Sequence, residues 1–198
     1  MTEKLLGNQP QGKLFIISSP SGTGKTTLVE KLMQEFPDKI TRSITCTTRF
    51  ARENELEGKD YFFLTEEEFH HKAKQGEFLE SAEVFGYHYG TLKADVEKLL
   101  SQGRHVILVI DTQGAKQVKR QRDAVSIFIS PPSMEELGRR LQKRGTETKQ
   151  SLERRLRKAE EEMKEISHYD YHMVNDQLQT AYQVLKSIII AEEHKVKK

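Results

Sequence analysis

One eight-residue segment constrains the fold more than any other part of the chain. It is Ser19-Pro20-Ser21-Gly22-Thr23-Gly24-Lys25-Thr26, and it lies between an apolar, β-branched run at residues 13–18 and a segment with helical spacing of apolar positions at residues 27–33. A strand, a glycine-rich loop and a helix in this order form a phosphate cradle, because converging backbone N–H groups and a helix N-terminus both favour an anion. The segment therefore predicts an α/β fold that binds a nucleotide phosphate.

The loop residues have separate tasks in this interpretation. Gly22 and Gly24 let the backbone approach the phosphates, and Lys25 neutralises the β- and γ-phosphates. Thr26 offers a hydroxyl to Mg²⁺. Ser19 stands where the usual pattern has glycine or alanine, so the motif departs from its consensus at one position. We therefore take Lys25 as a catalytic candidate and all eight residues as candidate ATP ligands; the alternative is a Gly/Ser turn with an exposed lysine.

Two further apolar runs indicate a parallel sheet. They span residues 105–110 and 125–129, and helix-like sequence follows each of them, as expected for strands buried on both faces. Asp111 ends the first of these runs. An acid at this place would hold Mg²⁺ or its waters, and the alternative interpretation is a cap for the next helix.

Two regions interrupt this alternation and suggest inserted lobes. Residues 40–91 are richer in Thr, Tyr, Gly and short strand-like pieces, and residues 135–158 are dense in arginine. A capping-box spacing predicts the start of a helix in each region, at Thr65 with Glu68 and at Ser133 with Glu136.

Composition limits the classes of partner. Among 198 residues, 32 Lys and Arg nearly balance 30 Asp and Glu, so the net charge of +2 gives no drive toward nucleic acid. No apolar run is long enough to span a membrane, and no apolar export segment opens the chain. Cys46 is the only cysteine, which excludes an intrachain disulfide framework and favours a reducing cytoplasm. We expect a cytoplasmic protein that binds neither nucleic acid nor membrane; its oligomeric state stays open.

Several ordered motifs then identify a resemblance. In residues 40–91 they are Thr45-Cys46-Thr47-Thr48-Arg49-Phe50-Ala51-Arg52, Gly58-Lys59-Asp60-Tyr61, Gly76-Glu77-Phe78-Leu79-Glu80 and Tyr87-His88-Tyr89-Gly90-Thr91. Beyond that region they are Ile110-Asp111-Thr112-Gln113-Gly114-Ala115, Pro131-Pro132-Ser133, Arg144-Gly145-Thr146-Glu147 and Val174-Asn175-Asp176. From about Gly12 to the end, the chain resembles the guanylate kinases.

The resemblance implies both a fold and a reaction. The fold would be α/β, with a P-loop core whose mostly parallel five-stranded sheet is flanked by helices, an inserted GMP-binding lobe and a small helical lid. The core would comprise residues 1–39, 92–134 and 159–198, the lobe residues 40–91 and the lid residues 135–158. The reaction would be reversible transfer of the γ-phosphoryl group of Mg-ATP to GMP, and also to dGMP, which makes ATP and GMP the partners and Mg²⁺ the cofactor.

The resemblance also assigns the acceptor site. Thr45 and Glu80 would face the guanine base, while the GMP phosphate would be held by Arg49, Arg52, Tyr61 and Tyr89, with Gly90 and Thr91 beside them. The chemistry agrees with this assignment. A fixed carboxylate can accept both N1–H and the N2 amine of guanine, whereas adenine would leave it unpaired, and polar sites reject such a mismatch strongly. Paired guanidinium groups suit a phosphate monoester.

On the donor side, the resemblance places Arg140, Arg144 and Arg155 in a mobile lid over the triphosphate, as catalytic residues, and Asn175 near the adenine. Two positions depart from the family in addition to Ser19. Ser81 stands where an aromatic residue often follows the glutamate, and Val109 stands where an acid is usual. Two alternatives stay open: a non-catalytic module of the same family that holds a phosphorylated peptide, and a P-loop kinase for another acceptor.

Overall fold

The core of the protein is a five-stranded sheet in which every neighbouring pair of strands is parallel. The computed structural model describes residues 5–7, 9–143 and 149–196. In spatial order, the strands are β2 (Ile40–Arg42), β7 (His105–Val109), β1 (Leu14–Ser18), β8 (Val125–Ser130) and β9 (Tyr171–Val174). The predicted α/β fold with a five-stranded sheet is therefore confirmed, and the sheet is parallel throughout.

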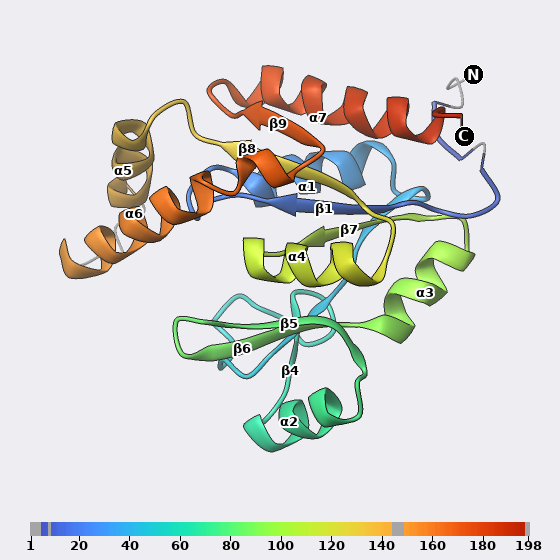
Figure 1. The fold of residues 1–198 in the computed structure, drawn as a ribbon, viewed down its shortest axis with the longest axis horizontal. Helices are drawn as coiled ribbons and strands as arrows, with labels where there is room; N and C mark the ends of the chain where they lie inside the picture. Colours follow the sequence, from blue (N-terminus) through green and yellow to red (C-terminus); the bar gives the residue numbers. More distant parts are fainter. Residues whose placement is uncertain (1–4, 8, 144–148, 197–198) are drawn as a thin grey trace.

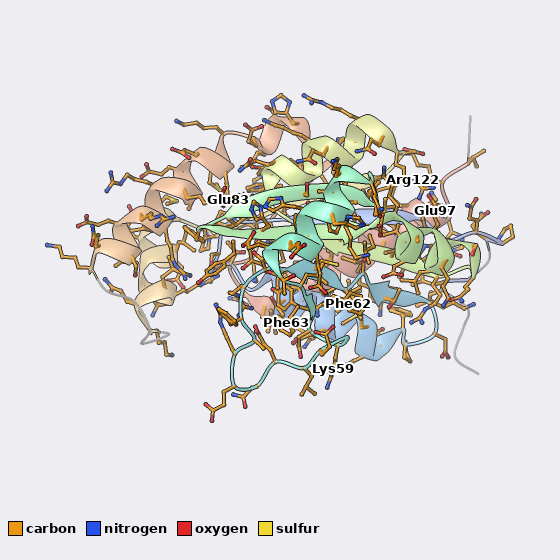
Figure 2. The ribbon with its side chains drawn as sticks, turned by 90° about the horizontal axis from the view of Figure 1, so that it is seen from below. Lys59, Phe62, Phe63, Glu83, Glu97 and Arg122 are labelled. Atoms are coloured by element: carbon orange, nitrogen blue, oxygen red, sulfur yellow. The ribbon has the colours of Figure 1, made fainter. Side chains whose placement is uncertain are left out.

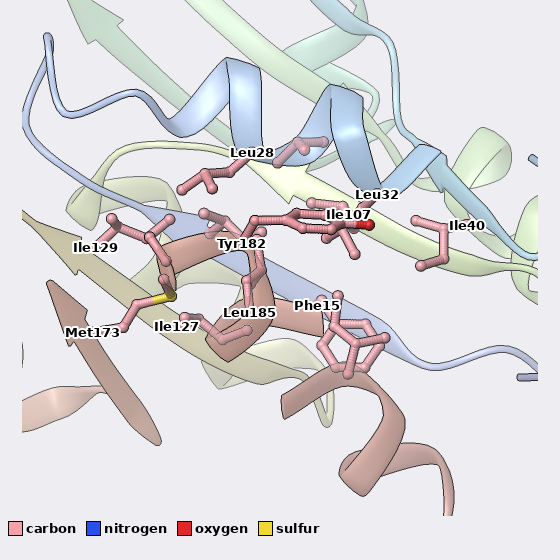
Figure 3. Close-up of a cluster of buried hydrophobic side chains, with 14 of the residues drawn as sticks. Phe15, Leu28, Leu32, Ile40, Ile107, Ile127, Ile129, Met173, Tyr182 and Leu185 are labelled. Carbon is pink, nitrogen blue, oxygen red and sulfur yellow. The ribbon is translucent and has the colours of Figure 1, made fainter. Parts of the chain in front are cut away.

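Helices cover both faces of this sheet (Figure 1). Because successive side chains of a strand point to opposite faces, Phe15 and Ile17 pack on one side and Leu14 and Ile16 on the other. The first side is covered by α1 (Lys25–Glu35) and α7 (Leu178–Glu193), and the second by α3 (Lys93–Ser101) and α4 (Thr112–Gln121). Figure 3 shows the first cluster, in which Leu28, Tyr182 and Leu185 close over the strands.

A buried polar pair joins α7 to the centre of the sheet. His105 is 2% exposed, and its Nε2 lies 2.7 Å from Oε2 of Glu193, which is 1% exposed. The backbone N–H of Lys13 donates to Nδ1 of His105 at 3.0 Å. Because Nδ1 accepts, the ring carries its proton on Nε2 and donates it to the carboxylate. The pair thus fastens the C-terminal helix to β7 and to the segment before β1.

The predicted lobe contains a second, mixed sheet. Its order is β4 (Tyr61–Phe63), β3 (Thr45–Thr47), β6 (Tyr87–Leu92) and β5 (Phe78–Val84). The helix α2 (Glu66–Lys74) packs on it through Phe69, which belongs to a small separate core with Cys46 and Phe78. The capping box is confirmed, since Thr65 and Glu68 exchange both bonds. Ile40–Arg42 lie within the predicted lobe range but form β2 of the core sheet.

The lobe is attached to the core through α4. The amide of Gln117 accepts from the backbone N–H of Ser81 at 3.1 Å and donates to its carbonyl at 2.7 Å, while Gln121 donates to the carbonyl of Leu79 at 2.9 Å. These bonds hold β5 against α4. At the far end of α4, Nη2 of Arg122 lies 2.6 Å from Oε1 of Glu97 (Figure 2). Ser81 therefore contributes to this contact through its backbone N–H and carbonyl, which any residue other than proline would preserve.

Two consecutive helices that pack against each other form the arginine-rich region at the left of Figure 1. They are α5 (Met134–Lys143) and α6 (Lys149–Met163), and they pack through a small apolar cluster that includes Leu137 and Leu156. The hydroxyl of Ser133 accepts from the backbone N–H of Glu136 at 3.2 Å, as the predicted cap requires. A short 3-10 helix (Ile166–His168) follows. In the described part of the chain, no helix combines the length and apolar character that a membrane crossing requires.

Candidate active site

The predicted phosphate loop leaves β1 at Ser18 and enters α1 at Lys25. Gly22 and Gly24 have φ angles of 97° and 87°, in the left-handed region that favours glycine. A Cβ on Gly24 would lie 2.6 Å from Nδ2 of Asn175, so this position excludes any side chain. The loop thus has the backbone shape that its glycines predict, with the N-terminus of α1 directed at its mouth.

Ser19, the departure from the motif consensus, is accommodated inside the loop. It is 5% exposed, and the hydroxyl of Thr23 lies 2.6 Å from its Oγ and 2.9 Å from the carbonyl oxygen of Pro20. The Thr23 hydroxyl thus joins Ser19 to the turn at Pro20, and the Ser19 side chain is satisfied within the loop.

Asn175 supports the loop from below. Its Nδ2 donates to the carbonyl of Thr23 at 2.6 Å, and the residue is 4% exposed. The backbone N–H of Asn175 donates to Ser130 at 2.8 Å, which fixes it at the end of β9. In the structure, Asn175 therefore holds the phosphate loop through Thr23. Its predicted contact with adenine stays a prediction.

Lys25 lies half-buried over the loop, with Nζ 3.3 Å from the carbonyl oxygen of Ser19. Burial lowers the pKa of its ammonium group, while the nearby carboxylates of Glu162 and Asp111 oppose that shift. A desolvated cation in this position interacts strongly with an anion, since few water molecules screen it.

Asp111 caps α4 with one oxygen and leaves the other without a hydrogen bond in the described part of the chain, so its predicted contact with Mg²⁺ or its waters stays a prediction. Its Oδ1 accepts from the backbone N–H groups of Gln113 and Gly114 at 3.1 and 3.0 Å and so caps α4. Its Oδ2 is buried and accepts no hydrogen bond from the described residues; Nζ of Lys158 lies 3.8 Å away. One oxygen is thus committed to structure, and the other is available to a cation or its water. Thr26, the second predicted metal residue, is exposed in the first turn of α1.

Two of the three arginines predicted for the lid, Arg140 and Arg155, lie near the phosphate loop or the segment that supports it. Arg140 donates to the carbonyl oxygens of Asn175 and Asp176 at 2.9 and 3.2 Å, and Arg155 donates to the hydroxyl of Ser21 at 3.2 Å. The third, Arg144, lies outside the described residues. Arg155 therefore contacts the phosphate loop directly, whereas Arg140 contacts the segment after β9 that supports the loop.

The acceptor residues predicted on different strands lie in one row across the lobe sheet. Thr45 of β3 is paired with Tyr61 of β4 and with Thr91 of β6, and Thr91 is paired with Glu80 of β5. Directly opposed residues in a sheet share a face, and Tyr89, two residues before Thr91, shares it as well. Gly90 alternates to the other face, where a Cβ would lie 2.9 Å from Cδ1 of Phe78.

Glu80 is a buried carboxylate at the end of this row. It is 4% exposed, and the hydroxyl of Thr91 donates to its Oε1 at 2.6 Å. Burial raises its pKa to about 7. A Cβ on Gly114 would lie 2.5 Å from Oε2, so only glycine at this position of α4 leaves room for the carboxylate.

The phosphate side of the acceptor site is partly assembled. The guanidinium carbon of Arg49 lies 5.3 Å from the centre of the Tyr61 ring, and the Tyr61 and Tyr89 rings are 6.2 Å apart. Nη2 of Arg49 is 2.8 Å from each carboxylate oxygen of Glu55. Arg52 joins the same turn through its backbone N–H, which donates to Glu55 at 2.9 Å, and it is exposed.

Four residues of the site escaped prediction. Lys158 and Glu162 follow Arg155 by three and seven residues on α6, so their helical spacing could have revealed them. Glu162 is 8% exposed, and burial raises its pKa to about 7. No helical spacing or motif of this kind pointed to Glu55. Phe85 lies at the tip of the β5–β6 hairpin, where cationic groups of Arg154, Arg155 and Lys158 stand 4.7, 5.8 and 5.1 Å from its ring centre.

The protein-family model described as guanylate kinase matches residues 11–192. This range covers the core, the lobe and the helical pair. The chain belongs to the guanylate kinase family.

Individual guanylate kinases are similar over nearly their whole length. The chain is 51% identical to the guanylate kinase of Protochlamydia amoebophila over 97% of both chains. It is 49% identical to that of Chlamydia trachomatis serovar D over 93% of this chain and 90% of the relative. The crystal structure of guanylate kinase from Anaplasma phagocytophilum superposes with a TM-score of 0.77 at 36% identity, covering 97% of this chain and 90% of that one. Fold and family thus agree with the motifs.

Proposed function

We propose that this chain transfers the γ-phosphoryl group of ATP to GMP, giving ADP and GDP. The family supports this activity, as do the curated relatives that carry the guanylate kinase name. We extend the proposal to dGMP as a second acceptor. The acceptor residues are assigned to the guanine base and the phosphate, and none of them is assigned to the ribose 2′-hydroxyl that dGMP lacks.

The observation that carries the choice of acceptor is the buried carboxylate of Glu80. It shares one face of the lobe sheet with Thr45 and Thr91, so acceptors and hydroxyl donors stand side by side. Guanine offers two N–H donors to the carboxylate and an O6 acceptor to Thr45. We assign the base to these residues, and the GMP phosphate to Arg49, Arg52, Tyr61 and Tyr89.

The proposed reaction needs no general base. A phosphate monoester has its second pKa at about 6, so the attacking oxygen of GMP is already ionised at neutral pH. As that oxygen bonds to the γ-phosphorus, the bond from the γ-phosphorus to the β,γ-bridging oxygen breaks and ADP leaves. Lys25, Arg140 and Arg155 would stabilise the charge on the transferring group, which is the main contribution a protein makes to this chemistry. We propose that Arg144 acts with them.

The residues present suit a hydrated Mg²⁺ ion. Oδ2 of Asp111 is buried and receives no hydrogen bond within the described chain, and hard oxygen ligands are those that Mg²⁺ prefers. We propose that Thr26 and Asp111 hold the ion, the latter through water. When bound with ATP, the ion supplies charge neutralisation at the β- and γ-phosphates.

We retain the division into three parts as a proposal: a core (1–39, 92–134 and 159–198), an acceptor lobe (40–91) and a lid (135–158). The separate apolar clusters of the core, the lobe and the helical pair support it. We also propose a cytoplasmic location, which the buried free thiol of Cys46 supports, because thiols stay reduced there.

The two alternative functions are weaker. A non-catalytic module would have no use for a desolvated Lys25 facing two carboxylates or for an arginine, Arg155, that reaches the phosphate loop. In a kinase for another acceptor, the carboxylate of Glu80 would have no use for its place in the row, because a base other than guanine does not offer it the N1–H and N2 amine donors.

An ADP-release assay with GMP, dGMP, AMP and UMP as acceptors tests the proposal. We expect turnover with GMP and dGMP and at least 100-fold less with AMP, by analogy with sites that lose a required hydrogen bond and discriminate by roughly 10⁴ or more. Lys25→Met should remove turnover while the thermal melt stays cooperative. Equal use of AMP and GMP would refute the acceptor assignment.

A further inference from the structure

A cluster of two histidines and one glutamate lies on the outer side of the lobe, apart from the nucleotide-binding residues. Glu66 and His70 come from α2, and His88 comes from β6. One ligand atom from each lies within 4.8 Å of the other two. None of these side chains belongs to the phosphate loop or to the row that contains Thr45 and Glu80.

The distances within the cluster match those around one metal ion. Oε2 of Glu66 lies 3.6 Å from Nε2 of His70 and 3.5 Å from Nε2 of His88. Two ligands bound to a tetrahedral Zn²⁺ at about 2.0 to 2.1 Å stand about 3.4 Å apart. The ligand nitrogens of the two imidazoles lie within 4.8 Å of one another, so a small side-chain rotation is enough to bring them to that spacing. An ion could therefore enter with little movement of the backbone.

The supporting structure holds all three side chains in place. Glu66 and His70 are four residues apart and thus on one face of α2, whose first turn is fixed by the Thr65 capping box. The ring of His88 stacks on Phe69 at 5.3 Å between centres and 23° between planes. The backbone of His88 exchanges two bonds with Thr48, of 3.0 and 3.1 Å. The backbone positions of Glu66 and His70 and the ring of His88 are therefore fixed before any ion arrives.

Charge and exposure also favour a cation here. The first turn of α2 carries three consecutive glutamates, one of which is Glu66. The side chains of Glu66, His70 and His88 are 56%, 64% and 28% exposed, so that an ion and its waters can reach them. Two imidazoles and one carboxylate suit Zn²⁺ and its neighbours far better than Mg²⁺, which prefers oxygen ligands.

We propose that Glu66, His70 and His88 form a binding site for one divalent transition-metal ion, of which Zn²⁺ is the representative, with water in the fourth position. The ion joins α2 to β6 and thereby crosslinks the lobe beside Tyr89. This site is separate from the proposed Mg²⁺ position at Asp111 and does not depend on the proposed reaction.

Titration of the nucleotide-free, metal-stripped full chain with ZnCl₂ in a calorimeter tests the site. We expect one Zn²⁺ per chain and a higher melting temperature with the ion. His70→Ala and Glu66→Gln should each weaken binding by more than about 10-fold, since even the loss of a group that merely orients a ligand costs about 10- to 100-fold. His71→Ala is the matched control, because His71 is exposed on the same helix and outside the cluster.

His88→Ala should also abolish binding, but it removes packing against Phe69, so His70→Ala carries the decision. His70 is well exposed, and its replacement should leave both folding and GMP phosphorylation unchanged. Full-strength binding by His70→Ala, or an equal loss in His71→Ala, would overturn the proposal. A Co²⁺ absorption spectrum typical of tetrahedral coordination, present in the native chain and absent in His70→Ala, would add support.

Discussion

The guanidinium carbon of Arg154 lies 4.7 Å from the centre of the Phe85 ring, so the lid helix α6 contacts the tip of the acceptor lobe. Phe85 has a φ angle of 53°, the only non-glycine residue of the described chain with a positive value. Large side chains avoid this region, yet here the ring meets cationic groups of the lid. The contact joins the helix proposed as part of the lid to the lobe proposed to bind the acceptor.

Phe85→Asn should therefore weaken the coupling without harming the fold. Asn is favoured at positive φ in a tight hairpin turn, so the melting temperature should hold or rise. Cation–π contacts at exposed sites are worth about 0.5 to 1 kcal/mol each, and we expect kcat/KM for GMP to fall roughly 3- to 10-fold in steady-state kinetics. Phe50→Asn, at an 88% exposed position of the same lobe, is the control. Unaltered kinetics in Phe85→Asn would argue against coupling.

Gly114→Ala should damage GMP use selectively. The added Cβ would meet Oε2 of Glu80 at 2.5 Å and displace the carboxylate from its place. We expect KM for GMP to rise at least about 10-fold, as for loss of one charge-assisted hydrogen bond, while ATP binding measured separately stays near native. Gly138→Ala is the control, because its Cβ would lie 3.9 Å from Leu156 and a helical Gly→Ala change gains up to about 1 kcal/mol. Equal GMP kinetics in both variants would contradict the prediction.

Glu80 should also impose a pH dependence on stability. Burial raises its pKa to about 7 from 4.5, so between these values the folded chain binds a proton that the unfolded chain has released. Stability is thus lost as pH rises through this window. Glu80→Gln should raise the free energy of unfolding by up to about 3 kcal/mol at pH 8, and the difference should vanish toward pH 4.5.

Denaturant titrations at several pH values, with Glu83→Gln as control on the exposed side of the same strand, measure this effect. In Figure 2, Glu83 lies toward the hairpin end of β5. A stability difference that stays constant with pH would show that Glu80 keeps an ordinary pKa.

Asn175→Asp should loosen the phosphate loop. The substitution keeps the shape but removes the donor to the carbonyl of Thr23, and an unsatisfied buried group costs about 1 to 3 kcal/mol. We expect KM for ATP to rise roughly 10-fold, with a smaller change for GMP, in two-substrate kinetics. Asp176→Asn, an exposed neighbour, should behave as the native chain. If GMP binding suffered more than ATP binding, the loop-supporting role would be wrong.

The strands and the motifs of this protein could be predicted because they depend on local pattern. Continuous apolar runs predicted β1, β7 and β8. Gly22 and Gly24 indicated a loop backbone with positive φ angles, which other residues avoid. The cap that Asp111 forms on α4 and its proposed contact with Mg²⁺ could be stated only as alternatives, since a sequence does not show which oxygen of a carboxylate is engaged.

The remaining features depend on contacts between distant segments. Nothing near Gly114 in the chain reveals that it must make room for Glu80, and nothing near Phe85 reveals a lid helix about seventy residues later. The pairing of Glu66 with His88 likewise required the lobe sheet to be assembled. The long apolar strands β1, β7 and β8 were therefore predicted correctly, whereas β2 was counted with the lobe instead of the core sheet and the partners supplied by tertiary structure were missed.

The helix α4 serves both halves of the proposed reaction at once. Its cap is Asp111, its first turn backs Glu80 through Gly114, and its middle grips β5 through Gln117. A helix is a stiff rod with a fixed rise of about 1.5 Å per residue. It would therefore fix the distance between the purine and the transferred phosphoryl group, so the protein would select its acceptor by length as well as by base.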